Sequence, residues 1–470
     1  MARQKKYPLQ QVLVERYAAE GKCVARVNEK VIFIEGAVPG DVVDIFVHKN
    51  KKDWGEARVT RLITPSSDRV TPFCSHFGTC GGCKWQMLPY NKQLLYKEEQ
   101  VKDQLRRIGH ITAQEYRPIA GCEQTQWYRN KLEFTFSNKR FLTAAEINNP
   151  DITPNHPSLG FHAPGLFDKV IPIEACFLQP EPTNAIRNFL RDLALEKGYS
   201  FYDQREHIGF LRNLMIRVAT TGQVLVNMVF AENLPEEIAF IMGKLNEQFP
   251  EITSLHYTIN TKFNDSLYDQ DIRLYHGTPY IEETLEQFTF RISPKSFFQT
   301  NTRQAEVLYG IARDFAQLQG HETVYDLYCG TGSIGIFLSP GAKKIIGVET
   351  VSDAVDDARV NAAINGVKQA EFFAGDVIDI CNDAFFKEHG EPDVVIIDPP
   401  RAGCHDKLLQ KLLEIAAPRL VYISCNPATQ ARDVQVLSSL YDVCISQAVD
   451  LFPHTHHIEN VILLERKTTA

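Results

Sequence analysis

Apolar residues in the last third of the chain occur in short runs, separated by longer amphipathic stretches. Such runs are typical of buried strands, and the stretches between the first five have the length and spacing of helices. This alternation predicts a Rossmann-like, doubly wound α/β domain with a mostly parallel sheet. No helical stretch separates the last two runs, which predicts one antiparallel strand. The predicted strands cover residues 323–328, 344–348, 370–374, 394–397, 420–423, 443–449 and 460–464.

The first sixty-odd residues show a different pattern, in which short apolar or alternating runs are punctuated by turn residues. Several such runs in so short a segment predict a small closed β-barrel, because closure removes exposed strand edges. The segment Thr64–Asp68, with its Pro and Ser residues, has the composition of a linker. The runs cover residues 12–14, 23–27, 31–34, 42–47 and 57–63.

Between these two parts lies a mixed α+β region, for which the pattern gives few boundaries. An apolar stripe predicts a helix over about 89–108, and Gly109 is its expected stop. We therefore expect three domains, over residues 1–65, 66–290 and 291–470.

Composition narrows the class of protein. The chain of 470 residues has no apolar run of membrane-spanning length, and no signal-peptide pattern. We therefore expect a cytoplasmic protein without a membrane partner, and a monomer by default. The net charge is −8, yet residues 1–70 hold 13 Lys and Arg against 9 Asp and Glu. A locally basic surface is sufficient to bind RNA, although lysines that merely solvate a small domain explain it equally well.

A glycine-rich turn, Asp326–Gly332, follows the first predicted strand of the C-terminal domain, where open sheets bind nucleotides. Glu349 ends the next strand, where a carboxylate can bind ribose hydroxyls. Asp376 and Asp398 follow the third and fourth strands, so carboxylates line the expected pocket. The turn lacks the Lys-Ser/Thr of a phosphate-binding loop. An acidic pocket suits a cationic ligand without phosphate, and S-adenosylmethionine is such a ligand.

Chemistry of a second kind follows the fifth predicted strand. The run Ser424–Pro427 places Cys425 directly before a helix, whose positive end favours a thiolate. A thiolate that attacks C6 of uracil creates an enolate whose C5 accepts a methyl group, and a base then removes the C5 proton. Glu459, before the last strand, is the candidate base, with the neighbouring histidines as competitors. These residues predict methylation of uracil at C5.

Four motifs together resemble the RNA uracil-5-methyltransferases that modify ribosomal and transfer RNA. They occur in the family order, and the resemblance covers nearly the whole chain: Ser293–Asn301, Asp398–Gly403, Ser424–Asp433 and Phe452–Glu459. The resemblance implies a class I methyltransferase domain, with Cys425 as nucleophile and Glu459 as proton acceptor. It also implies contacts to S-adenosylmethionine from Gln299, Tyr328, Ser333, Glu349, Asp376 and Asp398.

Three cysteines lie within ten residues, with glycines that let the chain wrap around a metal centre: Cys74, Cys80 and Cys83. Soft ligands at this spacing suit an iron–sulfur cluster or zinc, and the spacing alone does not separate the two. The resemblance implies a [4Fe–4S] cluster with Cys176 as fourth ligand, and Cys122 is the competing position. Because methyl transfer needs no electron, we expect the cluster to order the central domain.

RNA recognition is expected in two places. The first sixty-odd residues resemble a TRAM domain, an OB-like RNA-binding attachment. The run Trp127–Lys131 interleaves aromatic and cationic residues, as base stacking and phosphate contact require, or else forms a strand edge with exposed charges. The target uracil must leave its stack to reach the nucleophile. Phe297 and Phe298 are candidates for that pocket or for the core.

These expectations predict an enzyme that makes 5-methyluridine in 23S ribosomal RNA, since the transfer-RNA branch of the family commonly lacks both the TRAM domain and the cysteines. A transfer-RNA uracil methyltransferase is the alternative within the same chemistry. An amino-group methyltransferase with an Asp-Pro-Pro motif would need neither Cys425 nor Glu459. An inactive RNA-binding assembly factor would bind the cofactor without methyl transfer.

Overall fold

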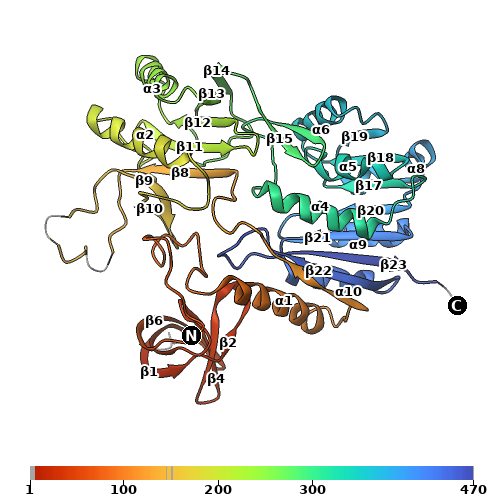
Figure 1. The fold of residues 1–470 in the computed structure, drawn as a ribbon, viewed down its shortest axis with the longest axis horizontal. Coiled ribbons are helices and arrows are strands. Elements are labelled where there is room, and N and C mark those ends of the chain that lie inside the picture. Colours follow the sequence, from red (N-terminus) through yellow and green to blue (C-terminus); the bar gives the residue numbers. More distant parts are fainter. Residues whose placement is uncertain (1–5, 144–145, 150–151, 469–470) are drawn as a thin grey trace.

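The computed structural model describes residues 6–143, 146–149 and 152–468 (Figure 1). Its N-terminal part is a six-stranded sheet that curls around a small apolar core, in the order β1-β5-β6-β4-β3-β2. Four of the five predicted runs lie within strands, and the run over 12–14 covers only the end of β1 and extends one residue beyond it. The two-residue β2 is an addition too short to leave a pattern. The strands are β1 (Tyr7–Leu13), β2 (Arg16–Tyr17), β3 (Cys23–Val27), β4 (Lys30–Glu35), β5 (Val42–Asn50) and β6 (Trp54–Thr64).

The central part is built on a seven-stranded sheet in the order β10-β9-β8-β11-β12-β13-β14. Helices α2 (Thr183–Lys197) and α3 (Pro235–Gln248) share its apolar core, and α3 forms the crossover between the parallel strands β12 and β13. The strands are β8 (Lys131–Ser137), β9 (Ser158–Ala163), β10 (Leu166–Pro172), β11 (Leu211–Val218), β12 (Val224–Phe230), β13 (Ile252–Ile259) and β14 (Ile272–Gly277).

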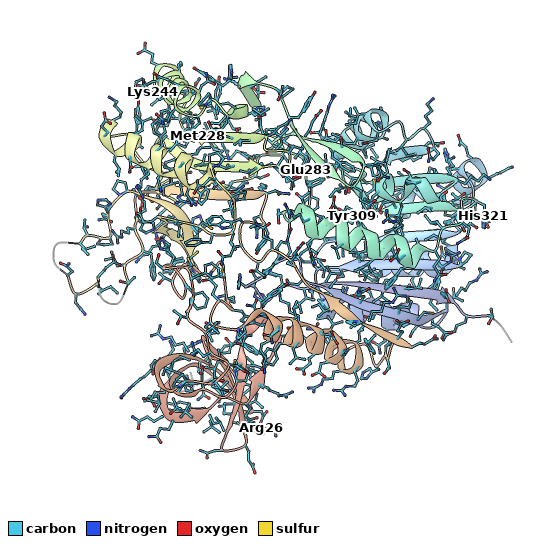
Figure 2. The ribbon with its side chains drawn as sticks, viewed as in Figure 1. Arg26, Met228, Lys244, Glu283, Tyr309 and His321 are labelled. Carbon is cyan, nitrogen blue, oxygen red and sulfur yellow. The ribbon has the colours of Figure 1, made fainter. Side chains whose placement is uncertain are left out.

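A hairpin of β15 (Ile281–Leu285) and β16 (Phe288–Ile292) leads into the C-terminal part. The buried Glu283 of this hairpin accepts hydrogen bonds from the Thr220 amide, at 3.0 Å, and from the Thr302 hydroxyl, at 2.8 Å. Figure 2 labels Glu283 between the central sheet and α4 (Thr302–Ala316). The contact fixes the start of α4 against the central sheet.

The C-terminal sheet has eight strands in the order β19-β18-β17-β20-β21-β23-β22-β7. All seven predicted strands are present, and β23 runs antiparallel to both β21 and β22, as expected. Alternate residues of each central strand face two different apolar cores, which is why these strands are continuous apolar runs. The strands are β17 (Thr323–Leu327), β18 (Lys344–Glu349), β19 (Ala370–Ala374), β20 (Val394–Ile397), β21 (Arg419–Ser424), β22 (Tyr441–Val449) and β23 (Glu459–Arg466).

Helices cover both faces of this sheet, and none of those in the described part of the chain is long and apolar enough to cross a membrane. The order of the parallel strands reverses between β17 and β20, which is where open α/β sheets bind ligands. The helices are α5 (Ser333–Leu338), α6 (Ser352–Ile364), α7 (Val377–Ile380), α8 (Asp383–His389), α9 (Asp406–Ile415) and α10 (Pro427–Leu437).

The eighth strand, β7 (Glu115–Ala120), comes from far earlier in the chain and pairs in parallel with β22. The helix before it, α1 (Tyr90–Arg107), matches its prediction closely and packs against α10. Residues assigned from sequence to the central domain thus complete the C-terminal sheet. The three-domain division stays a prediction at its boundaries.

Candidate active site

A cavity of about 930 Å³ lies at the carboxyl ends of β17, β18, β20 and β21. It brings together six of the eight side chains predicted to bind the cofactor or to catalyse. They come from six separate segments: Gln299, Tyr328, Glu349, Asp398, Cys425 and Glu459. The pocket therefore lies at the topological switch point of the sheet.

The other two predicted residues lie beside the cavity without lining it. The Ser333 hydroxyl is 3.0 Å from the hydroxyl of Tyr309, which Figure 2 labels on α4. The Asp376 carboxylate caps α7 and accepts a hydrogen bond from the Ile378 amide at 2.9 Å. Their contacts to a cofactor stay predictions.

The glycine-rich turn brings backbone close to the cavity. Gly332 has φ +76°, and a Cβ at this position would lie 2.9 Å from the Phe372 ring, so only glycine fits. The Gly330 amide donates a hydrogen bond to Glu349 at 3.2 Å, while the other Glu349 oxygen accepts from the Val351 amide at 3.0 Å. Glu349 is thus held in one orientation by backbone on both sides of the pocket.

Cys425 lies between β21 and α10 and is half-buried. Asn426 caps the helix through its Oδ1, and its Nδ2 donates to the Arg401 carbonyl at 3.0 Å. This bond ties the Asp-Pro-Pro-Arg loop to the residue beside the nucleophile. The arrangement fixes Cys425 relative to the end of β20.

The electrostatic setting of the thiol differs from the one expected from sequence. Burial, followed by the nearby charges of Glu459 and Asp398, raises the pKa of Cys425 to about 11, although Arg401 opposes the shift. The position of Cys425 before a helix was expected to favour the thiolate, but burial and two carboxylates outweigh that effect. In the ligand-free pocket the thiol is protonated near neutral pH.

The carboxyl groups of the pocket also resist ionisation. Burial, and then the charge of Asp398, raises the pKa of Glu459 well above its ordinary value, and Arg401 again opposes the shift. Burial raises the pKa of Asp398 to about 7. Carboxyl groups whose pKa is raised by burial and by a neighbouring negative charge are stabilised in their charged forms by a bound cation. The pocket therefore suits a cationic ligand.

A histidine was the competing base in the sequence interpretation. His457 lies 3.5 Å from the Arg401 guanidinium through its Nδ1, and its ring lies 4.3 Å from that of His456. Burial, with these two neighbours, lowers the pKa of His457 to about 3. A side chain that holds a proton so weakly is a poor acceptor, so the geometry favours Glu459.

The second half of the nucleophile motif has a positioning role. The buried Asp433 accepts hydrogen bonds from the Cys404 amide at 2.7 Å and the Tyr422 hydroxyl at 2.6 Å. Gly403 has φ +79°, and a Cβ there would lie 2.5 Å from Asp433. The loop that carries Asp398 is thus anchored to α10.

Two pocket residues were missed from sequence. Arg401 was part of a motif but was given no role, yet its charge lowers the pKa of both Cys425 and Glu459. Phe452 also lines the cavity, and its ring lies beneath the Arg129 guanidinium at 5.6 Å. Of the two phenylalanines considered for this place, Phe297 lines the pocket with 64% of its surface exposed, while Phe298 is buried in the core.

A second cavity, of about 560 Å³, is lined by all four predicted metal ligands, Cys74, Cys80, Cys83 and Cys176. Burial raises the pKa of Cys80 to about 11 and that of Cys83 to about 12, and neighbouring thiols add to both shifts. The competing Cys122 lies elsewhere and donates to the Asp450 carbonyl at 2.9 Å. Within the described ranges, no three His, Cys, Asp or Glu side chains are arranged to hold a metal ion.

Residues 450–457, which we call the strap, connect the two cavities. The amides of Lys84 and Trp85, next to the cysteine segment, donate to the His454 carbonyl at 2.8 and 3.0 Å. Near the start of the strap, Phe452 lines the active-site cavity. Glu459, which lines the same cavity, lies two residues after its end. One short segment therefore forms part of the surroundings of both sites.

The expectation that Trp127–Lys131 contacts RNA is wrong for two of its residues. Tyr128 is buried and donates to the Pro453 carbonyl at 3.1 Å, and Asn130 is buried and donates to the Gln299 carbonyl at 2.8 Å. The segment joins the central part to the strap and to the cofactor side of the pocket. The polar groups of Tyr128 and Asn130 therefore form hydrogen bonds within the protein.

The doubly wound sheet, its acidic pocket and the attached barrel define an S-adenosylmethionine-dependent methyltransferase that acts on RNA. Residues 211–467 match the protein family described as tRNA (Uracil-5-)-methyltransferase, and residues 9–60 match the TRAM domain. The chain therefore belongs to the RNA uracil-5-methyltransferase family.

Relatives with similar sequences cover nearly the whole chain. An uncharacterized RNA methyltransferase of Bacteroides thetaiotaomicron is 50% identical over 95% of this chain and 99% of its own length. One from Porphyromonas gingivalis is 48% identical over 96% of this chain and 98% of its own. Among solved structures, the tRNA (uracil-54, C5)-methyltransferase of Pyrococcus abyssi, in complex with S-adenosyl-L-homocysteine, is 26% identical. Its TM-score is 0.74, over 97% of this chain and 100% of that one.

Proposed function

We propose that this protein methylates C5 of a uridine in RNA, with S-adenosylmethionine as methyl donor, Cys425 as nucleophile and Glu459 as base. The carrying observation is that both side chains share one cavity with the predicted cofactor residues Gln299, Glu349 and Asp398. S-adenosylmethionine supplies an electrophilic methyl group on a sulfonium. Its positive charge suits a pocket in which burial and mutual repulsion disfavour ionised carboxylates.

The residues of the chain divide the reaction between them. The Cys425 sulfur forms a bond to C6 of the uracil, and the electron pair of the C5–C6 double bond moves to give an enolate. C5 then bonds to the methyl group as the bond from that methyl to the sulfonium sulfur breaks, and S-adenosylhomocysteine leaves. Glu459 accepts the C5 proton as the C6–sulfur bond breaks and the thiolate leaves. A raised pKa makes the Glu459 carboxylate a stronger proton acceptor, and Arg401 offsets the charge of the thiolate.

For the substrate we propose 23S ribosomal RNA, with transfer RNA as the second candidate. The TRAM domain and the cysteine pocket support the ribosomal assignment, whereas the Pyrococcus abyssi structure is that of a transfer-RNA enzyme. Unmodified transcripts of both RNAs, incubated with methyl-labelled S-adenosylmethionine and mapped by nuclease digestion and mass spectrometry, separate the two. Label in transfer RNA alone would overturn the ribosomal assignment.

The mechanism is tested by a covalent trap. In RNA that contains 5-fluorouridine, fluorine replaces the proton that Glu459 must remove, so the adduct cannot resolve. We expect a protein–RNA adduct on a denaturing gel, mapped to Cys425 by peptide mass and absent in Cys425→Ser. Cys444→Ser is the matched control, because this half-buried thiol on β22 lies outside the cavity lining. Cofactor binding with no adduct in any cellular RNA fraction would sink the mechanism.

We further propose that Cys74, Cys80, Cys83 and Cys176 hold a [4Fe–4S] cluster. The four thiols are not arranged as a ligand group in the described part of the chain, but all four line one cavity of about 560 Å³, which has room for a cluster as well as for a single zinc ion. Burial, followed by the charges of neighbouring thiols, raises the pKa of Cys80, Cys83 and Cys176, and a bound metal centre offsets both effects by stabilising the thiolates.

Anaerobic purification, followed by iron and sulfide analysis, tests this assignment. We expect about four irons per chain, lost in Cys176→Ser and kept in Cys122→Ser. Stoichiometric zinc without sulfide would favour the other metal. Retention of iron in Cys176→Ser would exclude this residue as the fourth ligand.

A further inference from the structure

An aromatic pair stands exposed on the central part, outside the lining of both cavities. The Phe263 ring stacks on that of His207, with centroids 4.4 Å apart and an interplanar angle of 29°. Phe263 is nevertheless 77% exposed, so one face of its ring is covered and the rest lies open. A rigid open aromatic face is what a nucleic-acid base stacks on.

The loop that presents Phe263, residues 260–271 between β13 and β14, is held by a fully buried arginine. The Arg212 guanidinium donates to the backbone carbonyls of Asn260, Lys262 and Asn264 at 2.6–2.8 Å, and pairs with Asp265 at 3.0 Å. Four contacts from one buried cation thus hold residues 260–265 of the loop on both sides of Phe263. An exposed phenylalanine on so constrained a loop is pre-organised for a ligand.

A second aromatic residue and a cation lie along the same surface. Arg205, two residues before His207, lies 5.2 Å over the ring of Phe167, which is 63% exposed. At its other end the loop carries Tyr268, which lines the active-site cavity. The surface formed by Phe167, Arg205, His207 and Phe263, here called the stacking platform, is therefore connected to the catalytic pocket through one ordered loop.

We infer that the stacking platform binds unpaired RNA nucleotides that flank the target uridine. This inference rests on the proposed function, since it assigns a place to the strand on either side of the flipped base. Aromatic and cationic side chains interleave as single-stranded RNA recognition requires. The nearby cations are already paired, Arg205 with Asp168 and Lys262 with Asp269, so stacking contributes more than phosphate contact.

Phe263→Ala in the full-length protein tests the platform, because so exposed a ring can be removed with little effect on folding. Binding of a fluorescent, unstructured 30-nucleotide RNA is measured by anisotropy. We expect affinity to fall by about 5-fold to 100-fold, with an unchanged slope of log Kd against log salt. Phe263→Trp should restore binding. Phe240→Ala on α3, a partly exposed phenylalanine outside the platform, is the matched control and should bind as wild type does.

Two further readouts separate this inference from the proposed function. In methylation assays Phe263→Ala should raise the KM for RNA and leave kcat and S-adenosylmethionine binding unchanged. If wild-type protein methylates uridine and Phe263→Ala keeps the wild-type Kd and KM for RNA, the platform is wrong and the function stands. If RNA binding depends on Phe263 but no uridine is methylated, the platform stands and the function fails.

Discussion

The two cysteine-containing cavities differ in what surrounds the sulfur. At Cys425 the pKa is raised by burial and then by two carboxylates, and an arginine opposes them. At Cys83 it is raised by burial and then by other thiols. In both sites the surroundings disfavour the thiolate form of the cysteine, and a nearby positive charge stabilises it. The two sites differ in the kind of cation that suits them, because carboxylates suit an organic cation whereas clustered thiols suit a soft metal.

The two cavities share one structural element, the strap. The His454 carbonyl accepts two amides from the cysteine side, and Glu459 follows a few residues later at the catalytic side. The position of the strap is set by a buried ion pair between Lys97 and Asp450 and by the hydrogen bond from Asn301 to the Leu451 carbonyl. One segment, held at several points, therefore contacts the surroundings of both cavities.

The largest effect on methyl transfer should come from removing the Cys425 thiol. Cys425→Ala should lower methyl transfer by on the order of 10⁴-fold or more, because a nucleophile acts as a unit with its base. S-adenosylmethionine binding, measured by calorimetry, should be unchanged. Turnover within tenfold of wild type would show that the pocket performs amino-group methylation or another chemistry that needs no thiolate.

Glu459→Gln should stop the reaction one step later. Methyl transfer to C5 does not need this carboxylate, but release does, so turnover should fall by about 10²-fold to 10⁴-fold. A covalent protein–RNA adduct should then accumulate on ordinary RNA without fluorine, visible on a denaturing gel. If turnover survives and no adduct forms, another group is the base. His457→Asn would then be the next variant, since this histidine lies close by.

Breaking the strap's anchor should act on stability. Lys97 and Asp450 are fully buried and 2.7 Å apart, so Lys97→Met leaves an uncompensated charge and should cost about 3–5 kcal/mol in urea unfolding. Lys102→Met removes an exposed partner of Glu98 on the same helix and should change stability by less than about 1 kcal/mol. Equal small losses in both variants would mean that the buried pair does not hold the strap.

The sequence was sufficient for the central strands of the C-terminal sheet because both faces of each are buried, which leaves continuous apolar runs. It was insufficient for β7, whose short segment contains a proline and two charged residues and pairs with a strand more than 300 residues away. That pairing depends on where α1 docks. No local pattern reports it.

A similar limit applies to the site. Asp398 and Cys425 were predicted because each directly follows a strand, and strand ends meet at one edge of a parallel sheet. The raised pKa of Cys425 was not predicted, because it depends on burial and on the proximity of Glu459 and Asp398, which lie on other segments. Burial of Tyr128 likewise depends on the strap. Motifs gave the identities of the reacting groups, while packing decides their protonation.

The smallest effect, and the sharpest test of the comparison, concerns Asp398. In cofactor-free protein the rate of Cys425 alkylation by iodoacetamide, followed by peptide mass, should rise about tenfold per pH unit between pH 7 and 10. The reason is that only the thiolate reacts and its pKa is about 11. Asp398→Asn removes a charge that raises this pKa, so alkylation at pH 8 should quicken by about two- to fivefold. Asp379→Asn, an exposed carboxylate on α7 outside the cavity lining, should leave the rate unchanged. A slower rate in Asp398→Asn would mean that Asp398 promotes ionisation of the thiol, and the contrast between the two cavities would fail.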